Sequence, residues 1–323
     1  MNKSRFIAKK NKMTELIKTV LVTGSNGLLG QKITENVLAS GSVKLIATNR
    51  GDNKYPVKGG YVYETMDILN KEQVHAVLER NLPDALIHTA AMTNVDTCHE
   101  QNDACWQLNV DATQYLASLC DKMGIHFIYV STDFVFDGLN GPYKEGDQAK
   151  PISFYGESKL AGEAITQQIK GDWTIIRTIL VYGILKDMSR SNIVLWAKSA
   201  LEKGNPINVV NDQWRMPTLA EDLAEACLLA VGHKASGIYH ISGKDMMTIA
   251  NLVEKVADFW GLDKSLIAEI SSDSLGQEAK RPKKTGFILD KAMTNLNYQP
   301  HSFEEGLALV SRQLSGISGQ FTV

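Results

Sequence analysis

The chain has 323 residues, in which 34 lysines and arginines stand against 36 aspartates and glutamates, giving a formal net charge of −2. This length suits one large domain or two that share a core, because single domains usually have ~100–200 residues. A charge balance so close to zero generates no global field to attract nucleic acid or an anionic membrane, so a small-molecule partner is favoured.

The first residues, MNKSRFIAKKNKM, are basic and lack the ~7–15-residue apolar core of a signal peptide. No run approaches the ~18–20 apolar residues that a membrane-crossing helix needs. The four cysteines form no C-x-x-C pair, which is typical of reduced thiols in a cytoplasm. We therefore predict a cytoplasmic protein. Residues 1–18 are interpreted as an N-terminal extension, of which residues 1–12 are either disordered or an upstream start before Met13.

Six short runs rich in β-branched residues alternate with helical patterns in the first part of the chain. They lie at residues 19–24, 43–49, 60–67, 84–90, 126–132 and 173–178. Between the first two runs, Leu29, Ile33 and Val37 recur at helical spacing, which predicts an amphipathic helix. Strands that alternate with helices are joined by parallel crossovers, so we predict an α/β fold with a Rossmann-like, doubly wound parallel sheet.

After about residue 179 the alternation weakens and the helical patterns become irregular. The sheet domain is therefore predicted to span residues 19–178, and a smaller C-terminal, substrate-binding lobe to span residues 179–323. Two stretches within about 212–245, DQWRMPTLAEDLAEACLLAV and GIYHISG, are typical of a helix and a strand. We expect this helix and strand to return to the first sheet.

The first run leads into a glycine-rich loop, Gly24-Ser-Asn-Gly27-Leu-Leu-Gly30, at the junction of a predicted strand and helix. Gly24 permits a tight turn, Gly27 lets the backbone approach a pyrophosphate, and Gly30 lets the helix pack closely on the strand. The free N–H groups of the helix N-terminus would bind the anion. Three glycines alone also occur in ordinary turns, so the flanking strand and helix are what indicate a dinucleotide-binding loop.

This loop identifies residues 19–178 as an NAD(P)-binding domain. Cofactor contacts are expected at Gly24, Asn26, Gly27 and Leu28. At the end of the second strand, where an acidic residue would hold the ribose 2′-hydroxyl of NAD, the chain has Asn49 and Arg50. Arg50 predicts a 2′-phosphate and hence NADPH, with NADH possible if this arginine is only a solvated loop residue. Asp67 and Ile68, after the third strand, are candidates for contact with adenine, although an Asp there is also common in turns.

A second motif, YGESK, places Tyr155 and Lys159 four residues apart where a helix begins, so both side chains project from one face. The free pKa of tyrosine, ~10, makes it a poor acid–base catalyst, and an ammonium one turn away favours the phenolate. Thr132, at the carboxyl end of the fifth strand, would give a carbonyl oxygen a second hydrogen bond. A Tyr–Lys pair alone is usually a surface feature, but beside a glycine loop it predicts hydride transfer to a carbonyl.

A cluster of potential metal ligands lies between these motifs. Asp96, Cys98, His99 and Glu100 are close in sequence, but their spacing matches no zinc pattern. We interpret them as the solvated start of a helix and predict no metal site.

The motifs together resemble those of the extended short-chain dehydrogenases/reductases, and within that group the dTDP-4-dehydrorhamnose reductases. The resemblance rests on TGSNGLLG, TAAMTNVD, LNVDAT, STDFVFDG, YGESKLAGE, RTILVYG, DQWRMPT and RPKKTGFILD, between residues 23 and 290. It implies an NAD(P)H-dependent oxidoreductase that reduces a nucleotide-linked 4-keto-6-deoxy sugar. Tyr155 would donate the proton, Lys159 would lower the tyrosine pKa and hold the cofactor ribose, and Thr132 would anchor the carbonyl.

The resemblance implies further roles. Family members pair through helices corresponding here to about 103–122 and 155–170, which implies a homodimer. Asn109 would be a structural asparagine near the active site. Cofactor contacts are implied for Thr89, Ala90 and Ala91, and substrate contacts for Thr93, Val95, Thr132, Asp133 and Arg281. Of these, Arg281 would lie near the nucleotide-sugar phosphates unless it belongs to an ordinary basic turn.

The chain departs from the reductase pattern at two places, where Ile179-Leu180 replaces Ser-Trp and Arg215 replaces Gly. Either change would reshape the sugar pocket. Sugar 4,6-dehydratases follow the Thr-Asp pair with Glu, and Phe134 at that position argues against dehydration. Two alternatives stay open: an epimerase that keeps NAD bound, and a non-catalytic NADP-binding subunit, because the regulatory subunit of methionine adenosyltransferase resembles the same branch.

Overall fold

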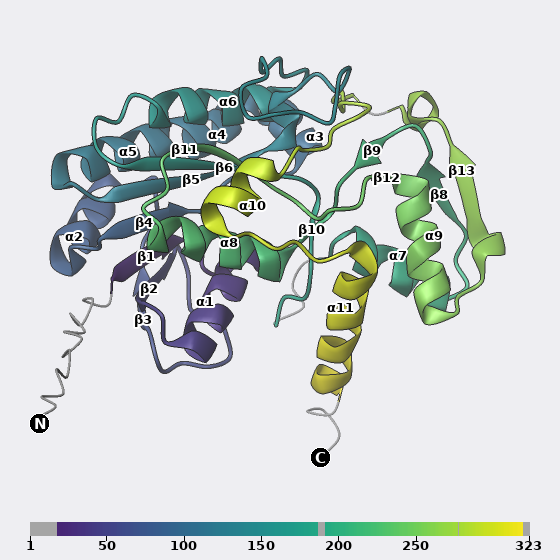
Figure 1. Ribbon diagram of the computed structural model, residues 1–323, viewed down its shortest axis with the longest axis horizontal. Helices are drawn as coiled ribbons and strands as arrows, with labels where there is room; N and C mark the ends of the chain where they lie inside the picture. The colour runs from purple at the N-terminus through teal and green to yellow at the C-terminus, as the bar shows by residue number, and fades with distance from the viewer. Residues whose placement is uncertain (1–17, 187–190, 277, 319–323) are drawn as a thin grey trace, which may run out of the picture.

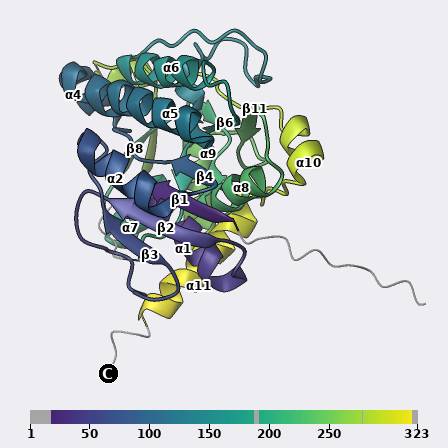
Figure 2. The same ribbon diagram turned by 90° about the vertical axis from the view of Figure 1, so that its left-hand side faces the viewer.

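The computed structural model describes residues 18–186, 191–276 and 278–318. A parallel sheet covered by helices on both faces forms the larger part of the molecule, and a smaller lobe stands beside it (Figures 1 and 2). Of the predicted N-terminal extension, residues 1–17 lie outside the described residues. Within the described residues, no helix is long and apolar enough to span a bilayer.

The central sheet of the described chain has seven parallel strands in the order β11-β6-β5-β4-β1-β2-β3. All six predicted strands are present, and a seventh comes from the second half of the chain, so the predicted fold class is confirmed. Most of their residues are buried, because helices cover both faces of the sheet. The strands are β1 (Thr19–Thr23), β2 (Lys44–Asn49), β3 (Val62–Thr65), β4 (Ala85–His88), β5 (His126–Thr132), β6 (Trp173–Thr178) and β11 (Gly237–Ile241).

Two apolar cores hold the covering helices on the sheet. One core joins the sheet to α1 (Leu28–Ser40), α8 (Ala220–Gly232) and α10 (Asp290–Leu296). The other joins the opposite face to α2 (Lys71–Asn81), α5 (Ala112–Met123) and α6 (Phe154–Thr166). Figure 2 shows these two helical layers on either side of the strands. Short helical segments follow β4 and β5, namely α3 (Val95–Glu100), α4 (Asn102–Trp106), the π-helix η1 (Gln107–Asp111) and the 3-10 helix η2 (Asp133–Val135).

The smaller lobe has its own apolar core, in which α7 (Ile193–Glu202), α9 (Ile249–Trp260) and α11 (Phe303–Ser318) pack together. In the described part of the chain, three two-stranded pairings complete it or connect it to the sheet domain. Their strands are β7 (Val181–Tyr182) with β10 (Thr218–Leu219), β9 (Trp214–Arg215) with β12 (Met247–Thr248), and β8 (Ile207–Val210) with β13 (Ile267–Ile270). Two 3-10 helices, η3 (Lys264–Leu266) and η4 (Ser272–Leu275), flank β13.

The strand order determines where a ligand can bind. From β1 the chain continues to β2 and β3 on one side, and it then crosses to β4, which pairs with the other side of β1, so the strand order reverses at β1. In such sheets, ligands occupy the crevice outside the carboxyl ends of the strands at this switch point. The loops after β1, β4 and β5 therefore converge on one region, and the smaller lobe faces it.

Candidate active site

The glycine loop joins β1 to α1. Gly24 has a φ of +70°, and a Cβ there would lie 2.9 Å from the Ala90 nitrogen. A Cβ at Gly30 would lie 2.5 Å from the Ser25 Cα, so close packing of helix on loop requires this glycine. At Gly27 the nearest atom is the Gly24 oxygen, 3.2 Å from a Cβ position, so most of the space in front of the helix N-terminus is open.

The loop fits a dinucleotide on two further observations. Gly27 is the N-cap of α1 and, as a glycine, has no side chain that could accept from the N–H groups of the first turn, so these groups are left for a ligand. The Ser25 hydroxyl is buried and has no hydrogen-bond partner among the residues that the structure describes. A buried hydroxyl normally has a hydrogen-bond partner. One that lacks a partner and lies beside a helix N-terminus is expected where an anionic ligand would bind and supply that partner.

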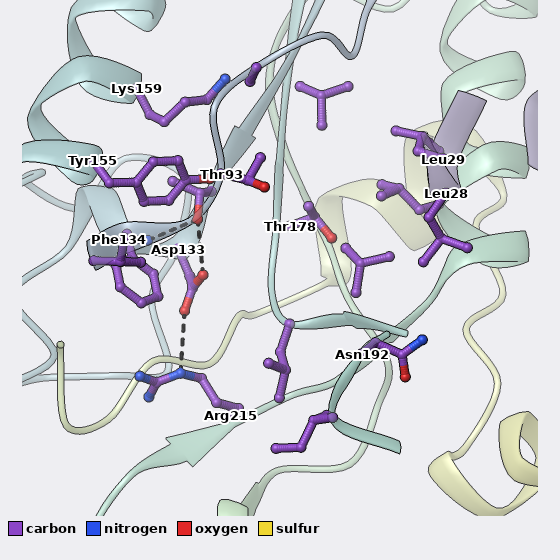
Figure 3. Close-up of a pocket in the computed structure, with 18 of the residues that line it drawn as sticks. Leu28, Leu29, Thr93, Asp133, Phe134, Tyr155, Lys159, Thr178, Asn192 and Arg215 are labelled. Atoms are coloured by element: carbon purple, nitrogen blue, oxygen red, sulfur yellow. Dashed lines mark hydrogen bonds and ion pairs between the residues drawn. The ribbon is translucent and has the colours of Figure 1, made fainter. Parts of the chain in front are cut away.

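Thr132, Tyr155 and Lys159 converge from β5 and α6. All three are buried, with exposed fractions of 6%, 8% and 4%. Ser153 caps α6 by accepting a hydrogen bond from the Gly156 nitrogen at 3.2 Å, which fixes where the helix begins. The ammonium of Lys159 lies over the Tyr129 ring, 4.1 Å from its centroid. Figure 3 shows the Tyr155 and Lys159 side chains one above the other at the cavity wall.

Burial dominates the electrostatics of this pair. It raises the pKa of Tyr155 above the usual value of 10, and a hydrogen bond with Thr132 opposes the rise only in part. Burial also lowers the pKa of Lys159 to about 7. The direction at Tyr155 is opposite to the lowering expected from the sequence, because burial removes the hydration that stabilises a phenolate and is the largest influence on this pKa.

A hydrogen-bonded asparagine holds the loop after β4 against α6. The Asn109 amide donates to the Met92 carbonyl at 3.0 Å and to the Ser158 hydroxyl at 3.0 Å, and its oxygen accepts from the Met92 nitrogen at 2.8 Å. Asn109 lies in a π-helical turn, a local irregularity that is frequent at functional sites. Because Ser158 stands between Tyr155 and Lys159, this network positions the helix that carries them.

Asp133 and Arg215 meet inside the same region. Asp133 is 2% exposed and Arg215 is 3% exposed, and 3.8 Å separates the carboxylate Oδ2 from the guanidinium Nε. Thr285 donates a hydrogen bond to Oδ2, and Thr132 donates one to Oδ1 at 3.2 Å. Burial raises the pKa of Asp133, and the nearby Arg215 charge opposes that rise. Figure 3 shows the pair joined by a dashed line among the residues that line the cavity.

Arg281 lines the cavity and contacts the short helix α3. One of its amino nitrogens donates to the Asp96 carboxylate at 2.7 Å, and the other donates to the Ala279 carbonyl at 3.0 Å. This contact corrects the expectation of a wholly solvated cluster at residues 96–100. Asp96 binds an arginine, and Cys98 is fully buried in a small apolar group that includes Tyr155.

One cavity of about 600 Å³ joins these features and has walls from both lobes. It brings together the predicted residues Gly24, Gly27, Leu28, Thr89, Ala91, Thr93, Val95, Thr132, Asp133, Tyr155, Lys159 and Arg281. The other predicted residues do not line it. The Asn26 amide donates to the Asp52 carbonyl, and the Asp67 carboxylate accepts from the Leu69 nitrogen. Arg50 is exposed after β2. Ile68 and Ala90 pack on the apolar core.

The sequence predicted a substrate-binding lobe and marked residues 179–180 and 215 as part of the sugar pocket, but it did not identify the other residues of the wall that the smaller lobe supplies. This wall consists of Leu180, Val181, Gly183, Leu185, Asn192, Ile193, Val210, Gln213, Arg215, Ile249 and Leu275, together with other residues. Leu180 has a φ of +40°, which is unusual for a branched side chain. Of the residues at which the chain departs from the reductase pattern, Leu180 and Arg215 line the cavity, whereas Ile179 is buried in an apolar cluster beside it.

Comparison with known proteins shows similarity along nearly the whole chain. The family model of the RmlD substrate binding domain matches residues 18–315. A probable low-salt glycan biosynthesis reductase, Agl14 of Haloferax volcanii, is 30% identical over 92% of this chain and 98% of its own length. The dTDP-4-keto-6-deoxy-D-glucose reductase of Streptomyces niveus is 30% identical over 82% and 86%. The methionine adenosyltransferase 2 subunit beta of Rattus norvegicus is 30% identical over 85% and 81%.

Solved structures share the same architecture. A dTDP-4-dehydrorhamnose reductase from Clostridium acetobutylicum is 27% identical, with a TM-score of 0.81 over 92% of this chain and 99% of that one. A dTDP-4-dehydrorhamnose reductase from Bacillus anthracis, solved in complex with NADP, is 26% identical, with a TM-score of 0.80 over 92% and 100%. Both lobes of the chain are therefore covered by these similarities.

Proposed function

The chain belongs to the RmlD substrate binding domain family, and on this premise we propose that it reduces a nucleotide-linked 4-keto-6-deoxy sugar, with dTDP-4-dehydrorhamnose as the leading candidate. The membership confirms the resemblance predicted from the motifs, and with it an NAD(P)H-dependent oxidoreductase of this type. The predicted nicotinamide cofactor is likewise confirmed, as NADPH with NADH possible, and a related reductase was solved in complex with NADP.

One observation supports the proposal more than any other. The same cavity is lined by the glycine loop, by Tyr155 with Thr132 and Lys159, and by Arg281. A dinucleotide whose diphosphate lay at the N-terminus of α1 could extend toward Tyr155, while a sugar diphosphate could reach Arg281 from the opposite side. The arrangement therefore suits a reaction between two bound molecules rather than simple cofactor storage.

The reaction proposed is ketone plus NADPH plus a proton, giving a secondary alcohol plus NADP⁺. When bound, the nicotinamide would supply the hydride that forms the new C–H bond at sugar C4. Tyr155 would transfer its hydroxyl proton to the C4 oxygen, and Thr132 would hold that oxygen by a second hydrogen bond. Lys159, once protonated, would stabilise the phenolate that Tyr155 becomes until a solvent proton restores it.

The test is a turnover screen with dTDP-, UDP- and GDP-linked 4-keto-6-deoxy sugars and with both NADPH and NADH. We expect the absorbance of the reduced nicotinamide to fall only when a keto sugar is present. Mass spectrometry should show a product two mass units heavier than that keto sugar. NADPH binding without oxidation on every sugar would contradict the proposal.

The similarity to methionine adenosyltransferase subunits favours a second candidate, a non-catalytic NADP-binding subunit. Such a protein would bind NADPH, reduce none of the sugars and co-purify with a synthetase. An epimerase is the remaining alternative, and tightly held NAD in the purified protein would favour it. Phe134, at the position where dehydratases carry an acid, argues against dehydration.

A further inference from the structure

Arg215 makes contacts that go beyond its ion pair with Asp133. One amino nitrogen donates to the Pro282 carbonyl at 2.8 Å, and the other donates to the Trp214 carbonyl at 2.7 Å and to the Lys283 carbonyl at 3.4 Å. The side chain is almost fully buried, and both ends of the guanidinium fork are engaged by protein oxygens. A guanidinium held in this way has little capacity left for a direct ligand contact.

Both sets of partners lie next to groups that the proposed reaction needs. Pro282 and Lys283 directly follow Arg281, the candidate diphosphate ligand. Asp133 directly follows Thr132, whose hydroxyl bonds to the Asp133 carboxylate at 3.2 Å. Arg215 therefore stands between the segment that would bind the sugar diphosphate and the strand end that would bind the sugar carbonyl.

Backbone contacts support the same connection. The Trp214 nitrogen donates to the Lys283 carbonyl at 2.7 Å, and the Thr285 nitrogen donates to the Trp214 carbonyl at 3.1 Å. The Lys284 nitrogen donates to the Gly138 carbonyl at 3.1 Å. Residues 282–285 thus lie between β9 of the smaller lobe and the loop after β5, with the Arg215 fork at the centre.

We infer that Arg215 is a positioning residue, which joins Asp133 to the 282–285 segment and thereby sets the distance between the carbonyl-binding and diphosphate-binding parts of the cavity. The role in substrate binding rests on the proposed function. The mechanical role does not, because all of the contacts that define it are within the protein. Arg215 would thus select sugar nucleotides in which the keto group and the diphosphate have the matching separation.

The first test needs no substrate. We would measure hydrogen exchange of the Lys284 and Thr285 amides by mass spectrometry of peptides from this segment. Exchange should be about tenfold faster in Arg215→Met, because without the guanidinium contacts the segment opens more often and exposes these amides. Arg215→Lys keeps the charge but not the planar fork, and the exchange rate of these amides in this variant should lie between the rates in the native chain and in Arg215→Met. Arg281→Met is the matched control and should leave these amides unchanged. Unchanged exchange in both Arg215 variants would overturn the inference.

The second test separates positioning from direct ligand contact. In Arg215→Met, KM for the nucleotide sugar should rise about tenfold, while KM for NADPH stays within about twofold. When Arg215→Met is added to an Arg281→Met variant, KM for the nucleotide sugar should rise much less, because the two residues act on the same contact. Effects that add independently would show that Arg215 contacts the substrate by itself, and would overturn the inference. If no sugar is turned over, the proposed function fails, while the exchange experiment still decides the mechanical role.

The buried Asp133 charge provides a further check, and a safeguard if Arg215→Met folds poorly. Combining Asp133→Asn with Arg215→Met removes both charges, so the double variant should be more stable than Arg215→Met alone. The 284–285 amides should nevertheless exchange faster than in the native chain, because the contacts to Pro282 and Lys283 are still absent. Native exchange rates in the double variant would contradict the role assigned to the fork.

Discussion

Glu163 and Arg177 form a buried ion pair through two contacts, with Nε to Oε1 at 2.9 Å and a terminal amino nitrogen to Oε2 at 2.6 Å. The Ser131 hydroxyl donates to the same carboxylate at 2.6 Å. Because Glu163 is one turn beyond Lys159 on α6, the pair fastens this helix to β6 and β5. The position of Tyr155 in the cavity therefore depends on a polar contact in the core as well as on apolar packing.

Replacing Arg177 with Met should lower the free energy of unfolding by about 3–5 kcal/mol, because it leaves the Glu163 charge buried without its partner. Adding Glu163→Leu should recover much of the loss. Urea unfolding measures both effects. Arg80→Met, which breaks an exposed pair with Glu64, serves as the control and should change stability little. Equal losses in the buried and exposed variants would contradict this account of the core.

Tyr155→Phe removes the proposed proton donor and keeps the ring in its apolar surroundings. We expect kcat for keto-sugar reduction to fall by about 10²–10⁴-fold, the usual contribution of a positioned acid, while NADPH affinity changes little. Tyr115→Phe is the control, because the Tyr115 hydroxyl donates to the Lys71 carbonyl at the start of α2 and Tyr115 is not among the residues that line the cavity. Undiminished kcat in Tyr155→Phe would exclude the mechanism.

Lys159 should make stability depend on pH in a defined window. Burial lowers its pKa from the usual 10.5 to about 7, so between these values the unfolded chain binds more protons than the folded one. The cost of burying this lysine is complete below about pH 7 and disappears as the pH rises toward 10.5. The stability of the native chain relative to Lys159→Met should therefore increase by up to about 1.4 kcal/mol per pH unit between pH 7 and 9. A difference that stays constant across this range, measured by chemical unfolding at each pH, would contradict the shift.

The glycine loop predicts two different responses to added methyl groups. Gly30→Ala places a Cβ 2.5 Å from the Ser25 Cα, so it should lower Tm and weaken NADPH binding together. Gly27→Ala meets only the Gly24 oxygen at 3.2 Å, so Tm should change little while NADPH affinity falls about tenfold or more. Gly146→Ala, with open space around its Cβ, is the control. Thermal melts and NADPH fluorescence titrations would distinguish these outcomes.

Arg50 provides a test of cofactor preference. If its charge binds the 2′-phosphate of NADPH, Arg50→Ala should raise KM for NADPH by about 10–100-fold, the value of a charge-assisted hydrogen bond. KM for NADH should stay the same, because NADH lacks that phosphate, and it serves as the internal control. A parallel change with both cofactors would show that Arg50 has no part in the discrimination.

Much of the fold could be predicted from local patterns. The six β-branched runs became β1 to β6. In β1, β2, β4, β5 and β6 most residues are buried, and strands covered on both faces favour apolar residues, a pattern visible over a short stretch. β3 lies at the edge of the sheet with no buried residue, and its β-branched and aromatic residues gave the signal instead. The dinucleotide-binding loop could also be predicted from a local pattern, since tight turns and close helix packing exclude side chains and therefore require glycines. Tyr155 and Lys159 could be paired because helical spacing places both on one face.

The contacts between distant segments could not be predicted in this way. Arg281 meets Asp96 from 185 positions away, and Arg215 meets Asp133 across the boundary between the two lobes. The direction of the Tyr155 pKa shift likewise depends on how deeply the assembled lobes bury the phenol. Local spacing determined which chemistry the chain carries, because side-chain type and backbone geometry are set within a few residues. Only tertiary packing determined which charged side chains contact each other and how far burial removes their hydration, since burial is a property of the whole fold.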